Sequence, residues 1–149
     1  MARNNTVFLD SSVLIAALLS AKGGSFYILD SYKDKFSFVT DEYVFGEVQE
    51  VIEKKLKRPD LRSSFLLTVG SVPVRIFPDA RGAHFQTAKR TVNLKDAPIL
   101  ASALEHANYL LTLDHDFLNQ KTKSCAESAG VSIYTPGEFI ERVRSEGGI

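Results

Sequence analysis

Strand-like segments alternate with helical segments along this 149-residue chain, and this alternation restricts the fold more than any other feature. The predicted strands are Thr6–Leu9, Phe36–Thr40, Val72–Phe77, Tyr109–Thr112 and Val131–Tyr134. The predicted helices are Ser12–Leu19, Ser25–Tyr32, Asp41–Leu56, Asp60–Val69, Gly82–Arg90, Asp96–Ala107 and Pro136–Arg144. Strands that alternate with helices form a mostly parallel sheet with helices on its faces. We therefore expect a three-layer α/β/α fold.

The length and composition indicate one soluble globular domain that spans residues 1–149. Hydrophobic residues make up 44% of the chain and charged residues 24%, which is ordinary for such a domain. The formal net charge is zero, so any surface that binds nucleic acid must be local. The single cysteine, Cys125, excludes an intrachain disulfide. No apolar stretch approaches the roughly 18 residues of a membrane span and no signal peptide is evident, so we expect a cytoplasmic protein without membrane association.

Aspartates follow two of the predicted strands. Asp10 comes directly after Thr6–Leu9, and Asp114 and Asp116 come shortly after Tyr109–Thr112. In an open parallel sheet, ligands bind beyond the carboxyl ends of the strands. The sequence therefore predicts an acidic site that is assembled from distant parts of the chain.

Helical spacing brings two further acids toward this site. Asp96 lies three and four residues before Ile99 and Leu100, so it shares their apolar face at the N-terminal end of its helix. Glu47 lies three residues after Val44 and borders the apolar stripe of its own helix, whereas neighbouring glutamates fall toward the polar side. We expect both carboxylates to face the edge of the core.

Each acid also has a simpler interpretation. Asp10 and Asp96 suit the capping position of a helix N-terminus. Asp114 and Asp116 suit a turn after a strand, and Glu47 suits a solvated helix face. Only the predicted convergence of all five favours a functional site. Two carboxylates about 4 Å apart repel by roughly 4 kcal/mol at an effective dielectric constant of 20, so such a cluster needs protons or a hard cation such as Mg²⁺ or Mn²⁺.

The order of these motifs resembles the PIN domain, a family of metal-dependent ribonucleases. The resemblance rests on FLDSSVLIAAL around Asp10, FGEVQEV around Glu47, KDAPILASAL around Asp96 and TLDHDF around Asp114, and it extends from Val7 to about Phe139. It implies a parallel five-stranded sheet with helices on both faces, and acids that ligate one or two Mg²⁺ or Mn²⁺ ions. It further implies endonucleolytic hydrolysis of RNA phosphodiester bonds.

The resemblance also assigns roles to individual residues. The positions that match the acids of the family are Asp10, Glu47, Asp96 and Asp114, with Asp116 as a commonly present fifth acid. Ser12 and Thr112 match small polar residues that orient ligands or water.

The densest basic stretch follows the helix that carries Glu47. It consists of Lys54, Lys55, Lys57 and Arg58, with Arg62 beyond. These side chains are candidates for binding the phosphates of RNA. Cations are also favoured at a helix C-terminus, which is an equally good interpretation of the same residues.

Several functional alternatives remain open at the level of sequence. No GxGxxG or Walker-type loop is present, so nothing indicates a dinucleotide or nucleoside triphosphate site. A non-catalytic PIN-like module that binds RNA or a protein partner is the main rival to a nuclease. A catalytic member is either the toxin of a toxin–antitoxin pair, with a small antitoxin as partner, or an RNA-processing or decay nuclease. The resemblance further suggests a homodimer.

Overall fold

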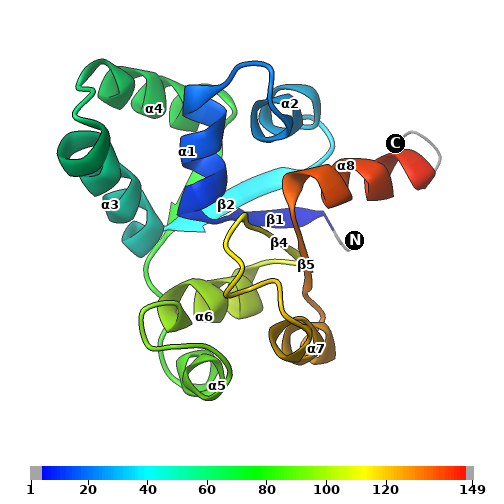
Figure 1. The fold of residues 1–149 in the computed structure, drawn as a ribbon. Coiled ribbons are helices and arrows are strands. Elements are labelled where there is room, and N and C mark those ends of the chain that lie inside the picture. Colours follow the sequence, from blue (N-terminus) through cyan, green and yellow to red (C-terminus); the bar gives the residue numbers. More distant parts are fainter. Residues whose placement is uncertain (1–4, 147–149) are drawn as a thin grey trace.

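The structure, a computed structural model, describes residues 5–146 and contains one five-stranded sheet (Figure 1). The strands are β1 (Thr6–Leu9), β2 (Ser37–Asp41), β3 (Val74–Phe77), β4 (Tyr109–Leu111) and β5 (Ser132–Tyr134). Their order is β3-β2-β1-β4-β5, and every neighbouring pair is parallel. The prediction of a five-stranded parallel sheet is confirmed.

Helices cover both faces of this sheet, as the three-layer prediction requires (Figure 1). On one face lie α1 (Ser11–Leu19), α2 (Gly24–Ser31), α3 (Glu42–Glu50), α4 (Asp60–Ser71) and α8 (Pro136–Ser145). On the other face lie α5 (Ala83–Thr91), α6 (Ala97–His106) and α7 (Gln120–Ser128). Within the described residues no single helix is long and apolar enough to cross a membrane, although α1 and α2 together pass that test as a pair bent by 94°.

Two helical features depart from the sequence prediction. The expected helix from Asp41 to Leu56 ends its α-helical part at Glu50 and continues as a π-helical segment, η1 (Val51–Leu56). Helix α7 was not predicted, because only Thr122 and Ala126 of its residues are buried and the apolar pattern is correspondingly weak. Its N-terminus is marked instead by Asn119, whose side chain accepts a hydrogen bond from the Thr122 amide at 2.9 Å.

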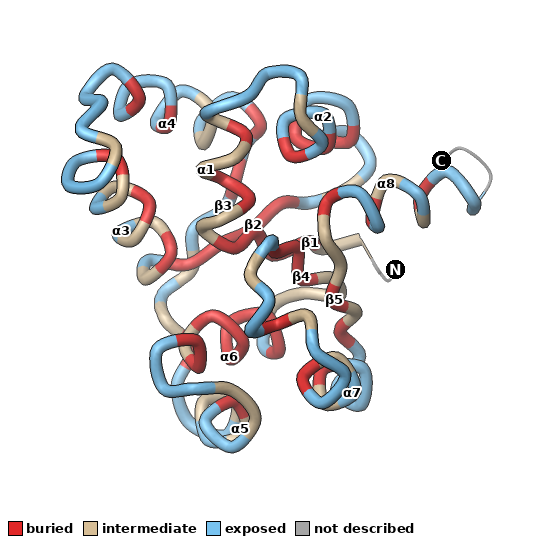
Figure 2. Tube along the Cα trace, viewed as in Figure 1, coloured by how far each residue is buried: buried red, intermediate tan, exposed pale blue. Residues whose placement is uncertain are grey.

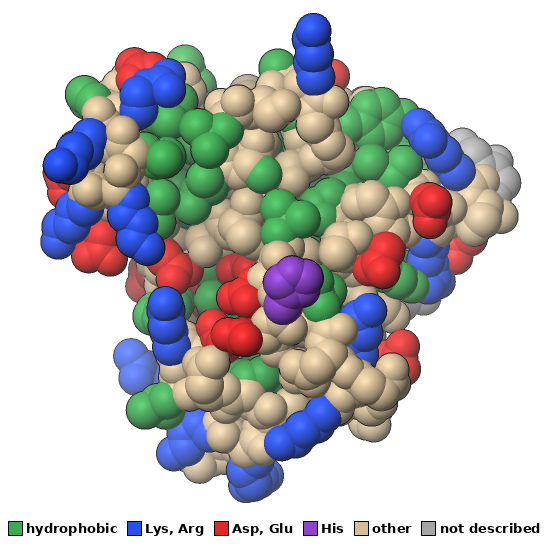
Figure 3. Space-filling view, viewed as in Figure 1, with side chains coloured by type: hydrophobic (Ala, Val, Ile, Leu, Met, Phe, Trp, Pro, Cys, Tyr) green, Lys and Arg blue, Asp and Glu red, His purple; other side chains and the backbone are tan. Residues whose placement is uncertain are grey.

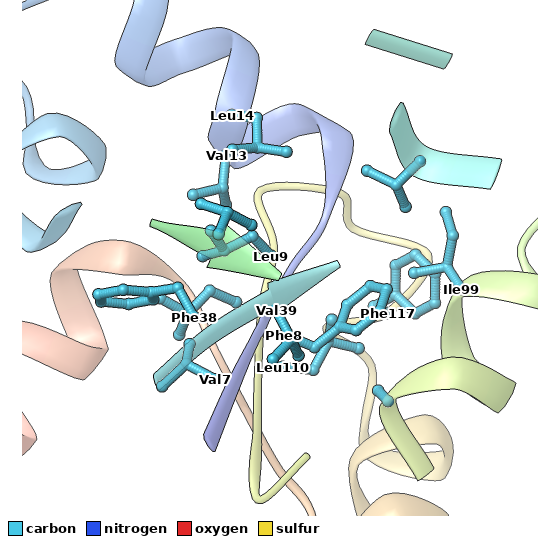
Figure 4. Close-up of a cluster of buried hydrophobic side chains, with 14 of the residues drawn as sticks. Val7, Phe8, Leu9, Val13, Leu14, Phe38, Val39, Ile99, Leu110 and Phe117 are labelled. Carbon is cyan, nitrogen blue, oxygen red and sulfur yellow. The ribbon is translucent and has the colours of Figure 1, made fainter. Parts of the chain in front are cut away.

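The core lies on both faces of β1, the central strand. Alternate side chains of a strand point to opposite faces. Leu9 lies beside Val13 and Leu14 on the α1 side, whereas Phe8 lies near Phe117 on the α6 side (Figure 4). Buried residues follow the sheet and the inward faces of the helices, and exposed residues follow the outer turns (Figure 2). Burial on both faces fixes the register of β1, and with it the position of the aspartate that follows.

Candidate metal centre

Two neighbouring strands bring distant polar residues together at the carboxyl edge of the sheet. Leu9 at the end of β1 pairs with Leu111 at the end of β4, and the Asp10 amide donates a hydrogen bond to the Leu111 carbonyl at 3.1 Å. Asp10 and Thr112 therefore follow adjacent strand ends. Acidic side chains gather near the centre of the face that Figure 3 shows, with lysines and arginines around them.

Asp10 is buried, and protein donors satisfy its carboxylate. One oxygen accepts from the Ser11 amide at 2.7 Å. The other accepts from the hydroxyls of Ser12 at 3.0 Å and Thr112 at 2.6 Å. Burial raises the pKa of Asp10, these hydrogen bonds oppose the rise, and the negative charge of Glu47 adds to it. Asp10 thus makes a hydrogen bond with the first turn of α1, as the capping interpretation expected, while it also faces another acid.

The same two hydroxyls connect Asp10 with the loop after β4. The Thr112 hydroxyl accepts from the Asp114 amide at 3.0 Å, and the Ser12 hydroxyl accepts from the Leu113 amide at 3.0 Å. Each hydroxyl therefore donates to Asp10 and accepts from the loop. Ser12 and Thr112 thus connect the Asp10 carboxylate to the backbone of the loop that carries Asp114.

Asp96, Asp114 and Asp116 form a three-carboxylate group, in which one oxygen from each lies within 4.8 Å of the others. Asp96 occupies the N-cap position of α6, as the capping interpretation expected, but its side chain makes no capping hydrogen bond. Asp114 does stabilise a turn, because it accepts from the Asp116 amide at 2.9 Å. Burial raises the pKa of Asp96 to about 6, and the charges of Asp114 and Asp116 add to the rise, whereas a hydrogen bond from Asn93 opposes it.

Glu47 lies on α3 and borders this group. It is half-buried, whereas Glu42, Glu50 and Glu53 are exposed, so Glu47 is the acid of this helical segment that faces inward. Its charge acts on the pKa values of Asp10 and of Tyr43, which places it within electrostatic reach of both.

Two carboxylate oxygens are buried without any hydrogen-bond partner, Oε1 of Glu47 and Oδ2 of Asp96. No ion pair within residues 5–146 involves either acid. A buried carboxylate oxygen without a donor is costly unless a proton or a cation satisfies it. The donor set is entirely oxygen, which fits a hard divalent cation such as Mg²⁺ or Mn²⁺.

Sequence reasoning missed two residues that border the acids. The Tyr43 hydroxyl donates to the Lys95 carbonyl at 3.2 Å. The Asn93 side chain accepts from the Asp96 amide at 3.0 Å and donates to an Asp116 oxygen at 3.4 Å. Asn93 stands three residues before Asp96, a spacing that suits a side chain bonded to a helix start, and that signal was available in the sequence.

The predicted basic stretch divides into two parts. Lys54, Lys57 and Arg62 line a groove of about 500 Å³ between α3, η1 and α4, together with the acids Glu50 and Glu53. Lys54 pairs with Glu50 at 3.3 Å inside this groove.

The remaining members, Lys55 and Arg58, do not line the groove. Arg58 makes two hydrogen bonds with Asp60, at 2.8 and 3.0 Å, so its charge is already compensated. Lys55 is exposed on η1.

Comparison with known proteins gives a family and solved structures of similar fold, including the two that follow. A family profile described as the PIN domain matches residues 7–123. The VapBC2 structure from Rickettsia felis, bound to a DNA fragment from its promoter, has a TM-score of 0.64 at 13% identity over 87% of this chain and 98% of that one. VapC20 of Mycobacterium tuberculosis, a sarcin-ricin loop cleaving toxin, has a TM-score of 0.53 at 19% identity over 75% of this chain and 92% of that one. No curated protein sequence matches this chain.

Proposed function

The chain belongs to the PIN domain family, and on that basis we propose that it is a metal-dependent endoribonuclease. The single observation that carries this proposal is the pair of buried, unpartnered oxygens of Glu47 and Asp96 beside the three-carboxylate group. Protein donors satisfy neither oxygen, and a hard cation would satisfy both. We propose Asp10, Glu47, Asp96 and Asp114 as the catalytic and metal-binding acids, with Asp116 as a further ligand.

The chemistry follows from the arrangement of these acids. A bound divalent cation neutralises charge on the phosphate and lowers the pKa of water. Asp96 and Glu47 offer free oxygens to it, whereas Asp10 already accepts three hydrogen bonds and keeps its place through Ser12 and Thr112. Asp114 uses one oxygen for its turn, which leaves the other to bind a ligand or to accept a proton from the attacking water.

We further propose that the groove beside α3 binds the RNA strand next to the scissile phosphate. Gly46 and Gln49 of α3 line the groove, so it runs along the helix that carries Glu47. Lys57 and Arg62 supply cations there that no acid within residues 5–146 pairs. Phosphate contacts of this kind fix the position of a strand without reading its sequence.

The biological role that we propose is that of a toxin held inactive by a small antitoxin protein. Its support is the fold that this chain shares with two solved toxin–antitoxin family structures. An RNA-processing nuclease would use the same centre. Co-purification of a small partner encoded next to this chain would favour the toxin role, and homodimer formation would be read from the mass of the same preparation.

The test is cleavage of a single-stranded RNA by the purified protein, in chelator and in Mg²⁺ or Mn²⁺, with Asp10→Asn as the inactive control. We expect cleavage by the parent only with metal and none by the variant. Cleavage that persists in chelator would contradict the metal centre. RNA binding without cleavage under any metal would favour the non-catalytic module instead.

A further inference from the structure

The carboxylates of Glu47 and Asp96 are less completely hydrogen-bonded than that of Asp10. Both oxygens of Asp10 accept hydrogen bonds, from Ser11, Ser12 and Thr112. In contrast, Oε1 of Glu47 and Oδ2 of Asp96 receive none. Their separation therefore depends on how the backbone of α3 lies relative to the residues that begin α6.

Tyr43 connects these two backbone segments. It is the second residue of α3 and lies one helical turn before Glu47, so the two side chains share a face of the helix. Its hydroxyl donates to the carbonyl of Lys95 at 3.2 Å, and Lys95 directly precedes Asp96. One hydrogen bond thus joins the helix of Glu47 to the backbone next to Asp96.

The backbone of Tyr43 is also held in place by a hydrogen bond. Its backbone amide donates to Oδ1 of Asp79 at 2.9 Å, which anchors the start of α3 to the segment after β3. Burial raises the pKa of the Tyr43 hydroxyl, and the charges of Glu47 and Asp96 add to that rise. The hydroxyl is therefore protonated, and it lies within the field of both acids while it donates to Lys95.

A second connection between the same helices lies deeper. Asp41, fully buried at the N-terminus of α3, accepts from the Val44 amide at 2.9 Å and from the hydroxyl of Ser102 on α6. Two hydrogen bonds therefore connect α3 with α6 and the residues before it, a buried one at Asp41 and an exposed one at the Tyr43 hydroxyl.

We propose that Tyr43 is a positioning residue of the metal centre: its hydroxyl bond to Lys95 sets the separation of Glu47 and Asp96 and so the affinity for the divalent cation. This inference rests on the proposed function, because it presupposes that the two carboxylates bind a cation. It assigns a role to a residue that carries no charge and lies outside every acidic motif of the sequence. Loss of the hydroxyl leaves the acids in place but lets their spacing vary.

The test compares the parent with Tyr43→Phe, which keeps the ring and removes only the hydroxyl. Melting temperatures are measured over a series of Mn²⁺ concentrations, starting in chelator. The Mn²⁺ concentration that gives a chosen shift in melting temperature should rise about fivefold in the variant, the factor that corresponds to the loss of one ordinary hydrogen bond. A matched control is Tyr134→Phe, which also removes a hydrogen-bonded hydroxyl, the one bonded to Arg142 away from the acids.

The outcomes separate this inference from the proposed function. A raised Mn²⁺ concentration for the chosen shift in Tyr43→Phe, with that of Tyr134→Phe equal to the parent value, supports the positioning role. Equal values in the parent and in Tyr43→Phe, or an equal rise in both variants, overturn it and leave the metal centre standing. A parent that shows no Mn²⁺-dependent shift overturns the metal centre and this inference together.

Discussion

On the side of β1 and β4, Asp10 accepts hydrogen bonds from Ser11, Ser12 and Thr112, whereas on the side of α3 and α6, Glu47 and Asp96 each keep a buried oxygen without a partner. We propose that both sides serve one metal centre. They differ in how their carboxylates are satisfied: protein donors reach both oxygens on the first side, and one oxygen of each acid has no protein donor on the second.

This difference suggests two roles for the carboxylates: Asp10, with its hydrogen bonds, supports the fold, and Glu47 and Asp96, with their unpartnered oxygens, are suited to bind a ligand. A buried oxygen that already accepts hydrogen bonds contributes to the stability of the fold. A buried oxygen without a donor costs free energy in the absence of a ligand, and a cation regains that free energy. Substitutions of the groups that donate to Asp10 should therefore act mainly on folding, and substitutions of Glu47 and Asp96 mainly on metal binding and activity.

The largest expected effect is the loss of activity in Asp96→Asn. Metal-bound charge stabilisation contributes several kcal/mol to catalysis, so RNA cleavage should fall by about a hundredfold or more. The rate of cleavage of a single-stranded RNA in Mn²⁺ measures it. Asp30→Asn, an exposed acid on α2, serves as the control and should cleave at the parent rate. Near-parent activity in Asp96→Asn would remove the distinction between the two sides.

The first side is tested by Thr112→Val, which removes the donor to Asp10 and the acceptor for the Asp114 amide. Two buried groups lose a partner, so the free energy of unfolding in chelator should fall by about 1–3 kcal/mol. Urea unfolding measures it. Thr68→Val, whose hydroxyl donates to the Ser64 carbonyl on the exposed face of α4, should cost less than about 0.5 kcal/mol. Equal costs at both positions would mean that the first side has no special structural role.

On the second side, the carboxyl group of Asp96 should make the stability of the metal-free protein depend on pH. The pKa of Asp96 is raised from 3.8 to about 6 in the folded protein, so the folded state binds this proton more tightly than the unfolded state. That stabilisation is complete below about pH 4 and is lost as the pH rises through about 6. Asp41, whose pKa is also raised to about 6 by burial, contributes in the same direction.

Thermal melts of the metal-free parent and of Asp96→Asn between pH 4 and pH 7 test this point. The parent should lose stability over that range, and the variant should lose less, because the contribution of Asp96 is gone while those of Asp41 and Asp10 remain. An identical decline in both proteins would show that the Asp96 carboxylate is satisfied without metal, like that of Asp10.

The smallest expected effect concerns the groove. If Lys57 contacts phosphate, Lys57→Gln should reduce the salt dependence of single-stranded RNA binding by about 0.7 in the slope of log K against log salt. Lys55→Gln removes the same charge from η1 outside the groove and should leave the slope unchanged. Filter binding at several salt concentrations measures both. Equal slopes in the two variants would return the whole basic stretch to the role of a helix-end cluster.

Much of this centre was predictable from sequence, for a topological reason. A parallel sheet brings the carboxyl ends of its strands to one edge, so Asp10 and Asp114 were expected to approach each other, and helical spacing turned Glu47 and Asp96 inward. The bond from Tyr43 to Lys95 was not predictable, since it depends on how two helices pack across the sheet.

Two further features were not predicted from the sequence: the division of the basic stretch and helix α7. Consecutive side chains of a helical segment point in different directions, so a contiguous run of cations is divided between a groove and an outer face. Helix α7 lacks a strong apolar stripe, and its start depends on one asparagine cap. Neither feature leaves a periodic signal in the sequence.

The most direct measurement of the central claim is a calorimetric titration of Mn²⁺ into the metal-free parent and into Asp96→Asn at pH 7. The parent should bind Mn²⁺, and the variant should bind it at least about tenfold more weakly, because one of its two unpartnered carboxylates has become a neutral amide. Equal Mn²⁺ affinity in the two proteins, or no binding by the parent, would contradict the assignment of Glu47 and Asp96 to a cation site.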